Sequence, residues 1–267
     1  MTDQQPETLS PPQEFLNAAA ELGIEFEPGD LDRLGRFLAI MLEANKTTNL
    51  TAITDPAQAW MKHIFDALTL VPVVASVTEN RDRQAAEAGV PDAPGPSPLS
   101  IIDIGSGGGV PALPLAIVMP DARVTLVEAT GKKVEFLRGA IKALGIANAS
   151  VIQGRAEGLG QDHKAHREKY DISTARALGH LAVVCELCGP LVKPHGVVIA
   201  VKGAKADAEL AESAKAMGEL GLRHSDTIQT PTGRLVVLEK TTRTPRTYPR
   251  RDGEPARVPI GVGKKTA

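Results

Sequence analysis

The spacing of apolar residues predicts helices in the first part of the chain. Two stripes at helical intervals indicate one helix from about residue 14 and a second with Asp30 as its N-cap. Residues 45–54 are expected to form a loop. A third helix is predicted to begin at Asp55-Pro56, because an aspartate can cap a helix and proline needs no N–H partner at the first helical position. The N-terminal part is therefore expected to be helical.

From Leu99 the pattern changes to short apolar strands that alternate with amphipathic helices, which is typical of a parallel sheet with helices on both faces. A final pair of strands flanks Pro231-Thr232-Gly233 and predicts a hairpin. The sequence thus indicates an α/β, Rossmann-like fold with a C-terminal antiparallel hairpin and an N-terminal helical extension. Strands are predicted at 99–104, 123–128, 150–153, 170–175, 197–201, 222–230 and 234–240. Helices are predicted at 132–144, at 180–192 with a break at Gly189-Pro190, and at 204–220.

Changes in composition suggest how the chain is divided. The segment 78–98 is polar and rich in proline, alanine and glycine, so it is predicted to be a flexible linker. The expected parts are a disordered N-terminus (1–13), a helical extension (14–77), the linker (78–98), a ligand-binding α/β domain (99–240) and a basic C-terminal tail (241–267).

The net charge of −2 is distributed unevenly. Residues 1–35 carry a net charge of −7, and residues 240–267 carry +6. A basic tail suggests an anionic partner such as nucleic acid, although a solvated tail that keeps the protein in solution explains the charge equally well. Charge by itself does not decide between the two.

Other features argue against membrane, secreted and metal-binding classes. No apolar stretch approaches the ~20 residues of a membrane span, and the N-terminus lacks a signal-peptide pattern, so a cytoplasmic protein is expected. The two cysteines, Cys185 and Cys188, lie one helical turn apart and are predicted to pack in the core. They lack the partners of a zinc site, so no metal is expected.

A glycine-rich loop follows the first predicted strand, where open α/β sheets bind their ligands. It reads Asp103-x-Gly105-x-Gly107-x-Gly109, and glycines let the backbone approach a ligand closely. An acid two residues before GxGxG resembles motif I of class I S-adenosylmethionine-dependent methyltransferases. The weaker pattern from Gly107 through Ala112 leaves an NAD site open. Glu128, at the end of the next strand, could bind the ribose hydroxyls of either cofactor.

Three later strand ends supply further candidates. Ala156 and Glu157 follow the third strand, where methyltransferases of this class hold adenine, although Glu157 could equally be an ordinary helix-start acid. Arg176 ends the fourth strand, which lacks the motif that orients an exocyclic amine. Lys202 ends the fifth strand and could reach a phosphate, or could be a surface lysine.

Several segments together resemble the GidB (RsmG) family of bacterial 16S ribosomal RNA guanine-N7 methyltransferases. They run in family order from about residue 31 to residue 260, and their joint occurrence is more specific than any single motif. The segments are Asn49–Pro56, Lys62–Ala67, Asp103–Pro111, Gln153–Glu157, Ser173–Ala177 and Tyr248–Pro255.

The resemblance implies a site, a cofactor and a partner. It implies that S-adenosylmethionine is bound at Gly105, Val110, Ala156, Glu157 and Arg176, beside the candidates Gly107 and Glu128. It implies a guanosine in the decoding-region loop of 16S rRNA, free or in the small ribosomal subunit, as the target. Guanine N7 brings a free lone pair, so no catalytic base is expected. A monomer is favoured. The residues offered for RNA phosphates are Lys202, Arg246, Arg250 and Arg251.

Three alternatives remain open at this point. A small-molecule methyltransferase would use the same cofactor but would not need the basic tail. An NAD-dependent oxidoreductase would use the Gly107 pattern. A non-catalytic RNA-binding module could retain the fold without the activity.

Overall fold

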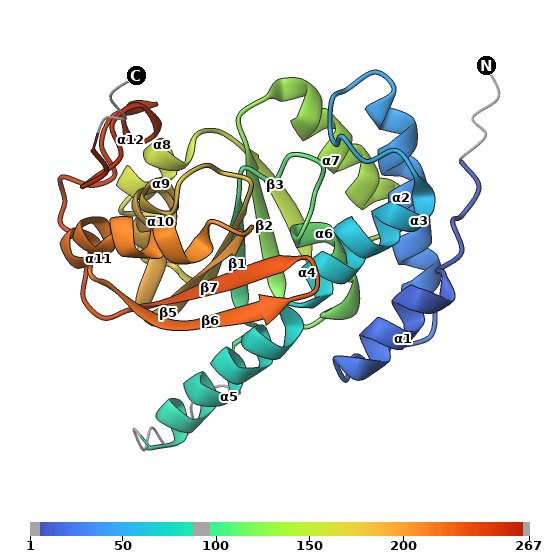
Figure 1. Cartoon of the computed structure of the whole chain (residues 1–267), viewed down its shortest axis with the longest axis horizontal. Helices are drawn as coiled ribbons and strands as arrows, with labels where there is room; N and C mark the ends of the chain where they lie inside the picture. Colours follow the sequence, from blue (N-terminus) through green and yellow to red (C-terminus); the bar gives the residue numbers. More distant parts are fainter. Residues whose placement is uncertain (1–5, 88–96, 264–267) are drawn as a thin grey trace. The chain divides into compact units, whose positions relative to one another are not determined.

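The structure is a computed structural model and describes residues 6–87 and 97–263. The chain divides into two compact units. The first unit comprises residues 1–99 and 106–152, and the second comprises residues 100–105 and 153–267. The strands form a seven-stranded sheet in the order β3-β2-β1-β4-β5-β7-β6, which confirms the predicted Rossmann-like fold (Figure 1).

The first unit is mainly helical, and its buried apolar residues include Phe15, Phe37 and Trp60. Asp55 caps the third helix as predicted, since its Oδ1 accepts a hydrogen bond from the Gln58 N–H at 2.8 Å. The elements are α1 (Gln13–Glu21), α2 (Asp30–Asn45), α3 (Pro56–Ala59), the π-helical turn η1 (Trp60–Phe65), α4 (Asp66–Leu68), α5 (Val71–Glu87), α6 (Ala112–Val118), β2 (Arg123–Glu128), α7 (Gly131–Leu144) and β3 (Ala149–Gln153).

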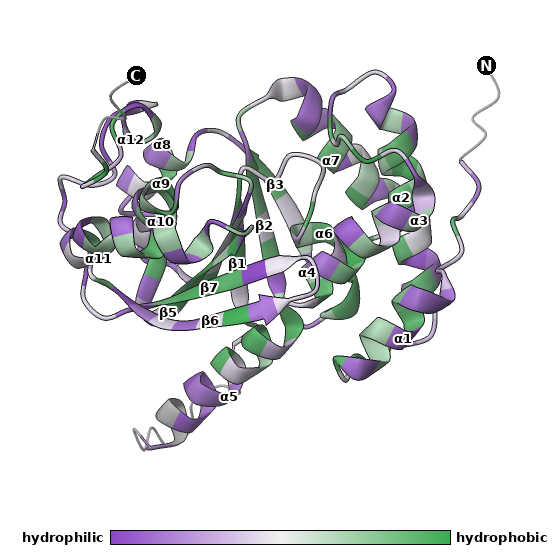
Figure 2. Cartoon of the chain, in the orientation of Figure 1, coloured by the Kyte–Doolittle hydropathy of each residue, from purple (hydrophilic) through white to green (hydrophobic). Residues whose placement is uncertain are grey.

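The second unit contains β1, β4 and β5 in parallel, with β7 antiparallel to both β5 and β6. The hairpin of β6 and β7 was therefore predicted correctly. Figure 2 shows apolar residues along β5 and β7. The elements are β1 (Ser100–Ile104), α8 (Ala156–Gln161), β4 (Tyr170–Arg176), α9 (Leu181–Cys188), the 3-10 turn η2 (Gly189–Leu191), β5 (Val192–Lys202), α10 (Ala206–Glu212), α11 (Ala214–Leu220), β6 (Leu222–Thr230), β7 (Gly233–Lys240) and α12 (Glu254–Arg257).

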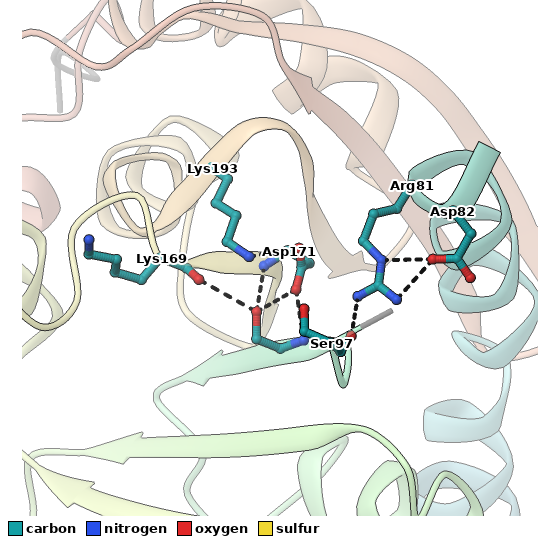
Figure 3. A network of polar contacts seen from close by, with 7 residues as sticks. Arg81, Asp82, Ser97, Lys169, Asp171 and Lys193 are labelled. Atoms are coloured by element: carbon teal, nitrogen blue, oxygen red, sulfur yellow. Dashed lines mark hydrogen bonds and ion pairs between the residues drawn. The ribbon is translucent and has the colours of Figure 1, made fainter. Parts of the chain in front are cut away.

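Asp171 anchors the beginning of β4 in the second unit (Figure 3). Its Oδ2 accepts hydrogen bonds from both the N–H and the hydroxyl of Ser100, and its Oδ1 lies 3.0 Å from Lys193 Nζ. Burial raises the pKa of the Asp171 carboxyl, but the hydrogen bonds from Ser100 and Lys193 outweigh it, so the pKa is lowered. The ionised carboxylate therefore ties β1, β4 and β5 together at this end.

The helices differ from the predictions in three places. Helix α5 runs to Glu87, so the first part of the predicted linker (78–98) is helical, because good helix formers without proline occupy it; residues 88–96 lie outside the described residues. Gly29 rather than Asp30 is the N-cap of α2. The predicted helix 204–220 is interrupted at Ser213, whose buried hydroxyl donates to the Glu209 carbonyl at 2.6 Å.

The expectation that no stretch has the length and composition of a membrane span was wrong. The helical run Pro56–Arg83 meets that criterion with a mean hydropathy of 1.3, but 56% of the qualifying window is buried inside the protein. Such burial is typical of a core helix, and length and composition alone are weak evidence for a span.

Candidate functional site

In the first unit, the Glu128 carboxylate joins the glycine loop to the beginning of α7. Its Oε2 accepts the Gly107 N–H at 3.0 Å, and its Oε1 accepts the Thr130 N–H at 2.8 Å. The Ser106 N–H donates to the carbonyl of Val127 at 3.0 Å, which holds the loop against the end of β2. The carboxylate is therefore fixed in position before any ligand arrives.

The conformation of the loop requires glycine. Gly107 and Gly109 have φ angles of 52° and 87°. A Cβ atom on Gly109 would come within 2.7 Å of Leu113 Cδ1, so this glycine also allows the loop to pack on α6. Val110, the next residue and a predicted cofactor contact, is half-buried in the turn before α6.

In the second unit, β1 ends in a buried acid and an exposed glycine. Asp103 accepts a hydrogen bond from the Thr174 hydroxyl at 2.8 Å, and the two residues are paired in register between β1 and β4. Gly105 is exposed, with a φ of 73°, and a Cβ there would lie 2.9 Å from Leu178 Cδ1. The backbone of Gly105 is therefore exposed at the end of β1, two residues after a carboxylate that Thr174 holds in place.

Ala156 and Glu157 begin α8, and both are buried. Glu157 Oε1 accepts the Gly253 N–H at 2.8 Å, so the backbone of the C-terminal tail reaches this carboxylate. Within the described residues, the other oxygen, Oε2, has no hydrogen bond. Arg176 ends β4 and is half-buried, as expected for a side chain at the carboxyl rim of this strand.

The described part of the tail folds back onto the second unit. The buried Arg167 guanidinium, in a segment that the sequence predicts to be a solvent-exposed polar loop, donates to four carbonyls: Gly160 at 2.6 Å, Tyr248 at 2.7 Å, Thr244 at 2.8 Å and Pro245 at 3.0 Å. Gln161 Nε2 donates to the carbonyl of Pro249 at 2.8 Å. These contacts make the tail part of the packed structure.

Two of the four residues offered for RNA phosphates are engaged elsewhere. Arg250 pairs with the fully buried Glu186, and Lys202 Nζ lies 2.6 Å from Glu209 Oε2 and donates to the Gly179 carbonyl. Only 11% of the Lys202 side chain is exposed, because the turn after β4 and helix α10 enclose it. Neither side chain is presented to a phosphate. Arg246 and Arg251 are exposed, and their role stays a prediction.

The two cysteines are free and buried, as predicted. Burial raises the pKa of the Cys188 thiol to about 12, and it raises that of Cys185 further. Both thiols are therefore protonated and inert at neutral pH.

A polar cluster in the first unit was not assigned any role from the sequence. Asn45, Thr51 and His63 are joined by hydrogen bonds next to the glycine loop. The only sequence signal for it was that Thr51 and His63 fall within the segments Asn49–Pro56 and Lys62–Ala67, which carried the family resemblance.

The family model described as rRNA small subunit methyltransferase G, GidB, matches residues 30–236 of this chain. The chain belongs to the GidB family. Proteins named ribosomal RNA small subunit methyltransferase G are similar over nearly their whole length. The protein of Sorangium cellulosum (strain So ce56) is 40% identical over 243 residues, or 91% of this chain and 93% of that protein. The protein of Leuconostoc citreum (strain KM20) is 36% identical over 251 residues, or 92% and 98%.

The residues present fit the S-adenosylmethionine that the GidB family implies. Gly105 is exposed, and a Cβ there would lie 2.9 Å from Leu178 Cδ1, so glycine leaves the backbone bare for the close approach of a methionine moiety. Glu128 and Glu157 are two preoriented carboxylates of the kind that accept hydrogen bonds from ribose hydroxyls and an adenine amine. Gly107 and Gly109 resemble the Gly-x-Gly pattern of NAD-binding loops, but the match to the GidB family over residues 30–236 favours S-adenosylmethionine.

Proposed function

We propose that this chain transfers a methyl group from S-adenosylmethionine to N7 of a guanosine in the decoding-region loop of 16S rRNA. The observation that carries the proposal is the Glu128 carboxylate, held between the Gly107 and Thr130 amides in a chain of the GidB family. A carboxylate with two fixed amide donors keeps its remaining lone pairs in place for the two ribose hydroxyls.

Each candidate residue then has a role in holding the cofactor. Gly105, Gly107 and Val110 form the loop that backs the methionine moiety. Glu128 accepts hydrogen bonds from the ribose. The last three contacts follow β3 and β4: Ala156 and Glu157 hold the adenine, and Arg176 closes the site at the end of β4.

When bound, the cofactor supplies an electrophilic methyl group on a positively charged sulfur. Guanine N7 carries a lone pair and no proton, so the protein need not supply a base. Its residues bind the two reactants and align the nitrogen with the carbon–sulfur bond. Alignment of this kind can lower a barrier by ~7–11 kcal/mol.

The RNA contacts that remain available are Arg246 and Arg251, both exposed in the tail. A guanidinium pairs with a phosphate through two parallel hydrogen bonds, so exposed arginines suit an RNA backbone. We propose that the substrate is 16S rRNA, free or within the small subunit. We also propose that the protein is a monomer and acts in the cytoplasm.

The decisive experiment is mass spectrometry of 16S rRNA from cells with and without the gene. We expect one methylguanosine to disappear from the decoding-region loop and to return when purified protein and S-adenosylmethionine are added. Titration with S-adenosylhomocysteine and with NADH provides the second arm. Binding of NADH alone would contradict the proposal and favour an oxidoreductase.

A further inference from the structure

The loop between α2 and α3, residues 46–54, is held in a defined conformation by side-chain hydrogen bonds. Asn45, the last residue of α2, holds it from within. Its Oδ1 accepts the N–H groups of Leu50 at 2.8 Å and Thr51 at 2.9 Å, and its Nδ2 donates to the Thr51 carbonyl at 2.9 Å. One side chain therefore fixes three backbone groups, and the loop has a defined shape.

A second anchor comes from the π-helical turn η1. The Thr51 hydroxyl lies 2.8 Å from His63 Nε2 and accepts the Ile53 N–H at 3.0 Å. His63 is 4% exposed. Short π-helical turns are frequently found at functional sites, since they move one side chain out of the ordinary helical register. In this protein the residue in the altered helical register is His63, which holds the loop through Thr51.

The loop lies against the glycine loop in the same unit. A Cβ atom built on Gly108 would be 3.3 Å from Met41 Sδ and 3.6 Å from Leu50 Cβ. The neighbouring Gly107 donates to Glu128, the proposed ribose ligand. Met41 of α2 and Leu50 of the loop therefore pack against the glycine loop, one residue from the amide that donates to Glu128.

Asn49 is the exposed residue next to Leu50, and within the described residues its side chain makes no hydrogen bond. A carboxamide offers one acceptor and two donors in a plane. Guanine presents the complementary pair, the O6 acceptor and the N1–H donor, on its Watson–Crick edge. A contact at that edge leaves the N7 lone pair free for the reaction.

We propose that residues 46–54 form the acceptor side of the active site and that Asn49 recognises the target guanine through O6 and N1–H. The inference rests on the proposed function, since it assumes that the acceptor is guanine. Asn45, Thr51 and His63 are positioning residues that hold this loop in place.

The test compares two RNAs with two proteins. One 16S rRNA carries guanosine at the target position, and the other carries 2-aminopurine there, which keeps N7 but lacks O6 and the N1 proton. Asn49→Ala should lower kcat/KM on guanosine by about tenfold or more. The 2-aminopurine RNA should be a similarly poor substrate for the wild type. For Asn49→Ala the two RNAs should be equivalent, because the contact that distinguishes them is gone.

Gln58→Ala is the matched control, since Gln58 is an exposed carboxamide on α3 of the same unit, outside residues 46–54. It should leave kcat/KM unchanged, and both variants should bind S-adenosylhomocysteine as the wild type does. Equal rates for wild type and Asn49→Ala on guanosine, or an unchanged preference of Asn49→Ala for guanosine, would overturn this inference alone. A wild-type protein that methylates neither RNA would overturn the proposed function and this inference with it.

Discussion

The guanidinium of Arg250 lies against the carboxylate of Glu186 in a two-pronged ion pair: Nε is 2.8 Å from Oε1, and Nη2 is 2.6 Å from Oε2. The Arg250 N–H donates to the same Oε1 at 2.8 Å. Glu186 is fully buried in α9, and the pair fixes the tail to the second unit. The hydrogen bond and charge of Glu186 raise the pKa of Arg250, so this arginine is always charged.

Arg250→Ala should therefore destabilise the protein without changing how RNA binding depends on salt. Removing one partner of a buried pair leaves an uncompensated charge, which costs about 3–5 kcal/mol. Differential scanning calorimetry should show a melting temperature lower by roughly 10 °C. The exposed Arg257 is the matched control, and Arg257→Ala should melt within about 2 °C of the wild type. A normal melting temperature for Arg250→Ala would return this residue to the RNA-binding candidates.

Arg251→Ala should have the opposite profile. Its side chain is exposed, so stability should not change, whereas RNA binding should weaken. Each phosphate contact contributes ~0.7–0.9 to the slope of log affinity against log salt concentration. The slope should fall by about that amount in filter-binding measurements between 50 and 200 mM salt, a range over which such slopes are resolved. If the slope is unchanged, Arg251 makes no phosphate contact.

Gly105→Arg should abolish cofactor binding while the sheet remains folded. The new side chain would cover the exposed backbone after β1, with its Cβ 2.9 Å from Leu178 Cδ1, and a φ of 73° costs a non-glycine residue roughly 1–2 kcal/mol. Gly145→Arg isolates that strain, because Gly145 has a φ of 63° at the end of α7 and no atoms within 4 Å of a built Cβ. Calorimetric titration with S-adenosylhomocysteine should detect binding to Gly145→Arg and none to Gly105→Arg. Normal binding to both would show that the site lies elsewhere.

Glu128→Ala should weaken S-adenosylmethionine binding by roughly tenfold or more, since hydrogen bonds to a charged group contribute ~1.5–3 kcal/mol each. The variant also leaves the Gly107 and Thr130 amides without their shared acceptor, so the loop loses its anchor. Glu135→Ala, an exposed acid on α7, provides the comparison and should bind normally. An unchanged dissociation constant for Glu128→Ala would mean that this carboxylate serves the loop alone.

Lys240 should make stability depend on pH above neutrality. Its buried Nζ donates to the carbonyls of Gly189 and Leu220 and to the Thr244 hydroxyl. Burial lowers the pKa of Lys240 to about 8, below the value of about 10.4 in the unfolded chain. The unfolded state thus binds the proton more tightly, and the charged form disfavours folding at and below pH 8. The free energy of unfolding should rise between pH 8 and pH 10, by about 2 kcal/mol.

Urea denaturation at these two pH values, in wild type and Lys240→Met, isolates this group from the other lysines. The rise should be absent in Lys240→Met. The variant should also be less stable at pH 8, since three acceptors lose their donor. If both proteins respond equally to pH, Lys240 is not the group that titrates.

Local chemistry was enough to predict much of this protein. Alternating strands and helices predicted the sheet, and Asp55-Pro56 predicted a helix start, because the hydrophobic period and the caps act over only a few residues. The glycine loop and Glu128 could be identified for the same reason: each follows the end of a predicted strand, and parallel strand ends are where such sheets bind ligands.

Only the tertiary structure decided which charged side chains pair with one another. Arg250 could not be distinguished from Arg251 in the sequence, because a basic residue in a polar segment looks the same whether its partner is a phosphate or a glutamate 64 residues away. The same holds for the bonds from Gly253 to Glu157 and from Thr51 to His63. A carboxylate, an amide or an imidazole is recognisable by type in the sequence, but its partner is set by packing over long chain separations, which no local pattern encodes.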